Sequence, residues 1–236
     1  MKKERSIHIT YNVQDHEHRY AIRESIIRLI DEVRNQDNKP KKEINILDCG
    51  CGVGLFMRDL KRLGYRSVQG MDFDENCVEK AQKYGPCKKV SFSEIDKVYK
   101  RGEFDLVILS HVLEHMQHPT DILKKIKKIT SWIVLAVPNP LRPKIQIKYS
   151  IRGKNYSNKG HYHSWDHSHF ENFLSRYNDL EIVKWETDRV RIIPSRYLRK
   201  PLRILGLLDN LELKLMPNLL PFYSDSLIVL VKNEAK

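Results

Sequence analysis

The chain has 236 residues, of which 41% are hydrophobic and 31% charged, and its 42 basic and 30 acidic residues give a formal net charge of +12. This length favours one elaborated domain, residues 1–236, and the apolar runs are too short to span a bilayer, which excludes a membrane-spanning protein. The basic excess favours an anionic partner, whether nucleic acid, an acidic membrane surface or a phosphorylated substrate, and selects none of these.

The cysteines are too few and too unevenly spaced for a disulfide scaffold, and residues 1–11 contain no apolar segment typical of a secretory signal. We therefore expect a reducing, cytoplasmic setting. The four cysteines are Cys49, Cys51, Cys77 and Cys87.

Apolar residues recur at helical spacing between residues 15 and 36, which predicts an amphipathic leading helix. Short aliphatic runs then alternate with helical patterns. We expect strands at 44–47, 68–71, 104–109 and 132–137, and helices at 55–63, 76–84 and 122–129. This alternation predicts an α/β fold with a doubly wound, mostly parallel sheet and helices on both faces.

The amino-acid composition changes after Pro138-Asn139-Pro140, where a polar stretch rich in lysine, tyrosine and histidine begins. We expect a lid-like segment at 140–170 and an insertion at 189–222, which flank a helix and a strand. The helix is expected at 170–177, and strands at 181–187 and 226–231.

The most informative stretch runs from Asp48 through Gly50, Gly52 and Gly54 to Leu55, directly after an apolar strand. Alternate glycines permit a sharp strand-to-helix turn and let a ligand approach bare backbone. The dinucleotide-binding pattern, Gly-x-Gly-x-x-Gly or Ala, has its third glycine one place later than Gly54, so that a small residue stands at the position of Leu55. A carboxylate beside the turn would repel a pyrophosphate, but it suits a cation such as the ammonium of an amino acid.

This turn resembles motif I of the class I S-adenosylmethionine-dependent methyltransferases, whose pattern is acid-x-Gly-x-Gly-x-Gly. The resemblance covers residues 44–139 firmly and the two later strands loosely. It implies a seven-stranded Rossmann-like sheet, S-adenosylmethionine as the cofactor and methyl transfer as the reaction. Residues 44–139 are then the cofactor-binding core.

A second acid, Asp72, ends the next predicted strand about 20 residues past the turn, where a carboxylate can accept hydrogen bonds from a ribose. Helix capping is the structural alternative for Asp72 and Asp74, and Asp74 fits it better. The resemblance places Phe73 against the adenine, and Ser110 and His111 beside the methyl-donor pocket. The expected cofactor-contacting set is Asp48, Gly50, Cys51, Gly52, Gly54, Asp72, Phe73, Ser93, Ser110 and His111.

The histidines admit several interpretations. His111-x-x-Glu114-His115 fits the inverted zinc-protease motif, but it follows a predicted buried strand rather than lying within its own helix. Four more histidines lie between residues 161 and 169, where a lid and helix entry, capped by Asp166 or Ser168, is favoured over a metal site. We expect no metal. The candidate general bases are His111, His161 and His163.

Three functions remain open at this stage. The favoured one is methylation of a small-molecule or lipid- or sugar-linked acceptor. RNA is the second acceptor class, motivated by the net charge and by basic and aromatic residues between 144 and 159. The third is a non-catalytic, cofactor-binding subunit. Residues 189–222 also admit peripheral membrane contact, although a packed cap explains their pattern as well. The oligomeric state stays open.

Overall fold

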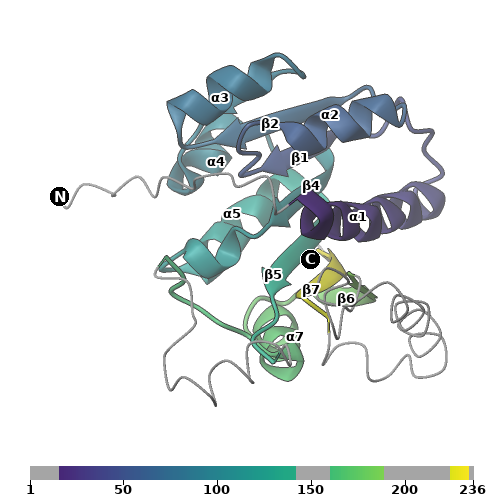
Figure 1. Cartoon of the computed structure of the whole chain (residues 1–236). Coiled ribbons are helices and arrows are strands. Elements are labelled where there is room, and N and C mark those ends of the chain that lie inside the picture. The colour runs from purple at the N-terminus through teal and green to yellow at the C-terminus, as the bar shows by residue number, and fades with distance from the viewer. Residues whose placement is uncertain (1–15, 142–159, 189–223, 234–236) are drawn as a thin grey trace, which may run out of the picture.

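Figure 1 shows a computed structural model of the chain, which describes residues 16–141, 160–188 and 224–233, with side chains of the first helix from residue 22 onward. The predicted insertion at 189–222 lies outside the described residues. Of the predicted lid, only residues 140–141 and 160–170 are described.

The elements alternate along the chain much as the sequence predicts. The helices are α1 (His16–Gln36), α2 (Leu55–Arg62), α3 (Glu75–Gln82), α4 (Ile95–Val98), α5 (Pro119–Ile129) and α7 (His167–Ser175), with 3-10 turns η2 (Phe92–Glu94) and η3 (Leu113–His115). The strands are β1 (Ile46–Cys49), β2 (Val68–Asp72), β3 (Cys87–Lys89), β4 (Phe104–Ser110), β5 (Thr130–Pro138), β6 (Glu181–Thr187) and β7 (Ser226–Lys232).

The strands form one seven-stranded sheet in the order β3-β2-β1-β4-β5-β7-β6. The first five strands in this order pair in parallel, whereas β7 pairs antiparallel with both β5 and β6. The prediction of a doubly wound, mostly parallel sheet is therefore confirmed.

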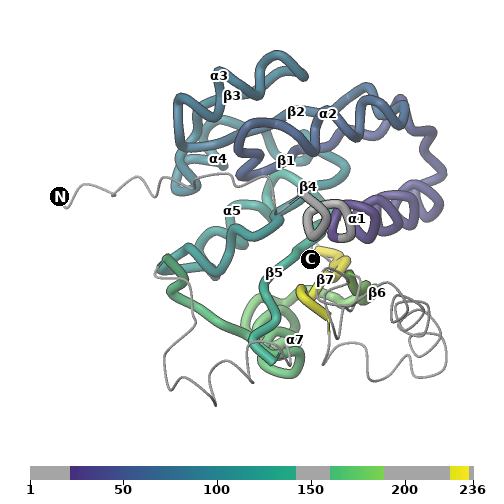
Figure 2. The backbone as a smooth tube through the Cα atoms, in the orientation of Figure 1, coloured from purple at the N-terminus to yellow at the C-terminus, as the bar shows by residue number. Residues whose placement is uncertain are grey.

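Side chains of the buried strands alternate between two cores, one on each face of the sheet. In β4, Leu106 and Ile108 join the core under α1, α2 and α3, whereas Val107 and Leu109 join the core under α4, α5 and α7. Figure 2 shows the backbone of β4 and β5 running between α5 on one side and α1 on the other. Because both faces are covered, the central residues of these two strands are apolar.

The ends of several elements differ from the sequence-based expectations, and helix α4 was not expected; for α7 and β3 the physical cause of the difference is clear. Helix α7 begins at His167, because the Asp166 carboxylate caps it by accepting a hydrogen bond from the His169 amide at 2.9 Å. Strand β3 was not predicted, since it has three residues and both of its lysines are exposed. Its position is set by pairing with β2 rather than by its own pattern.

None of the helices within the described ranges combines the length and the apolarity needed to cross a membrane.

We predict that Leu135→Ala, in the middle of β5, lowers the free energy of unfolding by about 2–5 kcal/mol. Leu135 is fully buried, and its strand lies between the parallel β4 and the antiparallel β7. Because both neighbouring strands hold the backbone in place, the truncation leaves a cavity that the sheet cannot collapse to fill. Urea unfolding followed by circular dichroism measures the change. The exposed Lys124→Ala serves as the control, and an equal loss there would contradict the prediction.

Candidate functional site

The candidate site lies at the carboxyl ends of the parallel strands. Strand β1 has β2 on one side and β4 on the other, so the chain order reverses between β1 and β4. Open α/β sheets bind ligands in the crevice outside such a reversal point. The residues that follow β1, β2 and β4 are the ones that the sequence singled out.

The glycine turn after β1 depends on backbone that only glycine adopts without strain. Gly50, Gly52 and Gly54 have φ angles of 85°, 53° and 76°. A Cβ atom on Gly50 would lie 2.6 Å from Cγ2 of Val112, so the turn passes directly under the segment that follows β4. A Cβ atom on Gly54 would lie 2.8 Å from Cα of Ala81. The absence of a side chain at Gly54 therefore lets α2 pack closely against α3, while Gly50 and Gly52 allow the sharp bend after β1.

Asp72, at the end of β2, holds the glycine turn in place. One carboxylate oxygen accepts a hydrogen bond from the Gly52 amide at 2.9 Å, and the other accepts one from the Asp74 amide at 3.0 Å. Asp74 itself caps α3 by accepting a hydrogen bond from the Asn76 amide, so the helix-capping alternative is confirmed for Asp74. Each oxygen of Asp72 keeps a further lone pair that can accept a hydrogen bond from a ribose hydroxyl.

Asp48 is a buried carboxyl group with only 4% of its surface exposed. Burial, with a further contribution from the charge of Asp72, raises its pKa to about 7 against the lowering effect of Arg23. Its Oδ2 atom has no hydrogen-bond partner among the described residues. A ligand ammonium would satisfy this oxygen, and so the residues present fit the amino-acid end of S-adenosylmethionine.

Two further residues of the expected cofactor-contacting set, Phe73 and Ser93, follow β2 and β3. Phe73 is 46% exposed although it is a large apolar side chain, which is what a ring that stacks on a ligand base requires. Ser93 lies in η2, is exposed, and shares a hydrogen bond of 2.9 Å with Ser91. Cys51, in the turn, places its Sγ atom 3.5 Å from Sγ of Cys87.

Ser110 and His111 end β4 at the same edge of the sheet. His111 has a φ of 57°, and its amide donates to the Ala136 carbonyl of β5 at 2.8 Å. Its Nδ1 atom lies 3.2 Å from Oε1 of Glu114, and its Nε2 atom lies 3.4 Å from Oγ of Ser226 in β7. The ring is about one third exposed, so it can contact a ligand, and its predicted role as a base stays a prediction.

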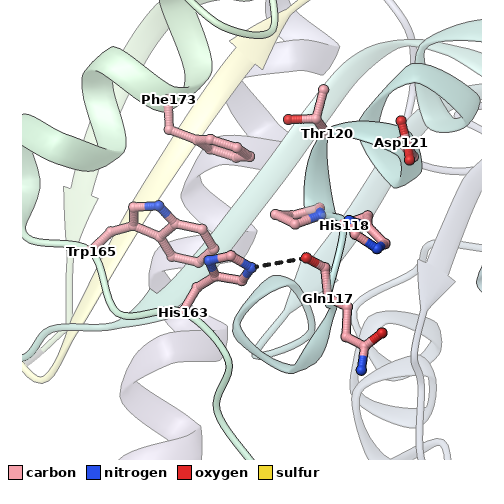
Figure 3. A pocket seen from close by; sticks show the side chains of 8 residues that line it. Gln117, His118, Thr120, Asp121, His163, Trp165 and Phe173 are labelled. Carbon is pink, nitrogen blue, oxygen red and sulfur yellow. Dashed lines mark hydrogen bonds between the residues drawn. The ribbon is translucent and has the colours of Figure 1, made fainter.

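The histidines of the 161–169 segment do not converge on one point. The His161 ring meets the His115 ring edge to face at 4.7 Å, whereas the His163 ring stacks on Trp165 at 5.1 Å. His163 and Trp165 line a pocket of about 300 Å³ together with Phe173 and residues 117–121. Figure 3 shows this pocket and the hydrogen bond of 3.3 Å between the His163 ring and the Gln117 carbonyl.

The remaining two histidines of this segment serve α7. The His167 ring lies 4.2 Å from the Trp185 ring, and His169 is hydrogen-bonded to the capping Asp166. The interpretation of this stretch as a helix entry is confirmed for Asp166 and His169.

The zinc-protease interpretation of His111-x-x-Glu114-His115 is wrong in its geometry. His111 follows a strand, and only Glu114 and His115 lie in the three-residue η3 turn, so the motif does not lie on one regular helix. Sequence reasoning weighed Glu114 only within that motif and did not find that its carboxylate is buried beside His111. It also missed Ser226, because no local pattern shows that β7 reaches the end of β4.

Comparison with known proteins agrees with this geometry. A family model described as a methyltransferase domain matches residues 15–184, and the chain therefore belongs to the methyltransferase domain family. Its fold matches magnesium protoporphyrin IX methyltransferase from Synechocystis PCC 6803 with bound SAH, with a TM-score of 0.61 and 16% identity over 95% of this chain and 89% of that one. The predicted resemblance to the class I S-adenosylmethionine-dependent methyltransferases is confirmed.

Two curated methyltransferases align with part of the chain. The mitochondrial ubiquinone biosynthesis O-methyltransferase of Saccharomyces cerevisiae is 31% identical over 38% of this chain and 30% of its own length. The ajmaline N-methyltransferase of Rauvolfia serpentina is 30% identical over 46% of this chain and 41% of its own length. The chain thus spans less than half the length of these two relatives.

We predict that Asp72→Asn weakens binding of S-adenosylhomocysteine by about 10- to 100-fold, because charge-assisted hydrogen bonds to the ribose and to Gly52 are lost. Isothermal titration calorimetry measures the affinity. Asp121→Asn, at an exposed carboxylate of α5, is the matched control and should bind like the wild type. Equal affinities in all three proteins would contradict a ribose role for Asp72.

We also predict that the affinity for S-adenosylhomocysteine rises between pH 5.5 and 7 by up to about tenfold. Because the pKa of Asp48 is raised, the folded protein keeps a proton on this carboxyl group at pH values where the unfolded chain has lost it. The contribution of Asp48 to the free energy of unfolding therefore falls as the pH rises from about 4 to 7. A bound ammonium favours the ionised carboxylate, so the ligand binds more tightly at pH values where Asp48 can lose its proton. Calorimetry at several pH values in Asp48→Asn should show a flatter profile, and a rise as steep as in the wild type would exclude Asp48 as its source.

Proposed function

We propose that this chain transfers a methyl group from S-adenosylmethionine to a small-molecule acceptor. The observation that carries the proposal is the pair of carboxylates around the glycine turn. Asp48 offers a buried oxygen with no donor among the described residues, and Asp72 offers lone pairs one strand away. S-adenosylmethionine fits both carboxylates, because its ammonium group can donate to Asp48 and its ribose hydroxyls can donate to Asp72.

When bound, the cofactor supplies an electrophilic methyl group. The protein then has to align an acceptor atom with that group, and good alignment accounts for about 7–11 kcal/mol of barrier lowering. His111 is placed for this task, because its ring ends β4 at the crevice and stays partly exposed. We propose that His111 forms a hydrogen bond with the acceptor and orients it.

The acceptor class rests on the relatives. One of them is named for ubiquinone biosynthesis and O-methylation, and the other for N-methylation of ajmaline, so small organic molecules with a hydroxyl or amine are the acceptors that we favour. A lipid- or sugar-linked acceptor and a cytoplasmic location remain part of the proposal.

The RNA alternative has less support. Its motivating basic and aromatic residues, 144–159, lie outside the described part of the chain. Residues 189–222, through which membrane contact was considered, also lie outside the described part of the chain. The family membership favours catalysis over a purely structural subunit.

The test measures transfer of labelled methyl from S-adenosylmethionine to a panel of phenols, quinols and amines, with total RNA as a separate arm. We expect turnover with at least one small acceptor. Asp72→Asn should reduce kcat/KM at limiting cofactor by about 10- to 100-fold through weaker cofactor binding. His111→Ala should reduce kcat by about tenfold or more and leave the affinity for S-adenosylhomocysteine within about twofold of wild type.

The exposed Lys124→Ala, which does not line the pocket beside His163, serves as the control and should retain wild-type turnover. Labelling of RNA alone, or full activity in His111→Ala, would contradict the proposed acceptor class or the proposed role of His111, respectively.

A further inference from the structure

The turn after β4 contains a carboxylate whose environment is unusual. The Glu114 side chain is 1% exposed, and neither of its oxygens has a hydrogen-bond partner among the described residues. An ionised carboxylate buried in this way is unfavourable unless a positive charge lies against it. The groups that approach it are imidazole rings, with Nδ1 of His111 at 3.2 Å and Nε2 of His115 at 4.0 Å from Oε1.

The hydrogen bond of His115 determines which of its nitrogens carries the proton. Its Nδ1 atom lies 3.0 Å from the carbonyl oxygen of Gly160, and a carbonyl oxygen can only accept, so Nδ1 donates. In the neutral ring, Nε2 then presents a lone pair toward the Glu114 carboxylate. Two electron-pair donors therefore face each other across 4.0 Å. Metal-binding histidines commonly show this arrangement, with one ring nitrogen bonded to a backbone carbonyl and the other directed at the ion.

The third side chain, His161, lies in the carboxyl-terminal part of the predicted lid. The His161 ring packs edge to face on the His115 ring at 4.7 Å, and one ligand atom from each of Glu114, His115 and His161 lies within 4.8 Å of the other two. Ligand atoms around a tetrahedral zinc ion are about 3.4 Å apart, given metal–ligand bonds of about 2.0–2.1 Å. Small side-chain rotations would close the remaining gap.

From these contacts we infer that Glu114, His115 and His161 form a binding site for a divalent cation, with zinc as the preferred ion. Two imidazoles and one carboxylate are a ligand set that zinc favours, whereas magnesium prefers oxygen ligands alone. His111 Nδ1 also lies 3.2 Å from Oε1 of Glu114 but is not one of these three ligands. This inference departs from the sequence-based expectation of no metal, because the expectation did not foresee that His161 packs on His115.

The site would fasten the end of the lid-like segment to the turn after β4. The Glu114 carbonyl already accepts hydrogen bonds from the amides of Tyr162 at 2.8 Å and His163 at 3.3 Å. A bound ion would add side-chain bonds to these backbone contacts and so hold residues 160–163 against η3. The inference stands independently of the proposed methyl transfer, because it concerns binding of the ion and not turnover.

The experiment uses the full chain, stripped of metal with dipicolinate and then titrated with Zn²⁺ by calorimetry. We expect one ion per chain, and a melting temperature that rises on addition of Zn²⁺ but not of Mg²⁺. His161→Ala and Glu114→Gln should each weaken zinc binding by at least about 10- to 100-fold, the range seen for residues that only support metal ligands. Titration with Co²⁺ should give the strong visible absorption of a tetrahedral site in the wild type and lose it in His161→Ala.

The matched control is His169→Ala, which removes an exposed histidine from the same segment. It should bind Zn²⁺ like the wild type, and circular dichroism should show that every variant is folded. Because Cys51 and Cys87 also lie close together, Cys51→Ser is titrated in parallel and should leave binding unchanged. No stoichiometric binding to the folded wild type, unchanged binding in both folded ligand variants, or loss only in Cys51→Ser would overturn the inference.

Discussion

The hydrogen bond from the Gly52 amide to the Asp72 carboxylate is the interaction on which the candidate cofactor site depends. It joins the turn after β1 to the end of β2, so the glycine turn and the Asp72 carboxylate hold each other in place. The left-handed glycines make this approach sterically feasible, because side chains at Gly50 or Gly54 would collide with Val112 or Ala81. Backbone conformation, carboxylate placement and strand order therefore support one another at the same edge of the sheet.

The sequence predicted this half of the molecule well because its signals are local. An apolar strand, alternating glycines and an acid at the next strand end each lie within a short stretch, and the parallel sheet then brings them together without further information. The same reasoning failed for β3, which has too few residues to show a pattern and exists because β2 offers it an edge. It also placed the start of α7 three residues late, at 170 rather than 167.

The surroundings of the histidines after β4 could not be predicted in the same way, since they depend on contacts between distant segments. His115 meets the Gly160 carbonyl across 45 residues of sequence, and His111 meets Ser226 across 115. The four histidines between 161 and 169 look alike in sequence, yet each faces a different neighbour in the fold. Only the tertiary packing of residues 160–165 on η3 distinguishes His161, which faces His115, from His163, which faces Trp165.

The position of β7 has a consequence for how the molecule is made. This strand is synthesised after every other described strand, yet it occupies an interior place between β5 and β6. Among the described strands, β6 touches the sheet through β7 alone. On the ribosome, the five parallel strands can associate early, whereas β6 has to wait beside an open edge of β5 until residues 226–232 emerge. Until β7 pairs with β5, that apolar strand edge stays exposed, and an exposed edge of this kind favours aggregation.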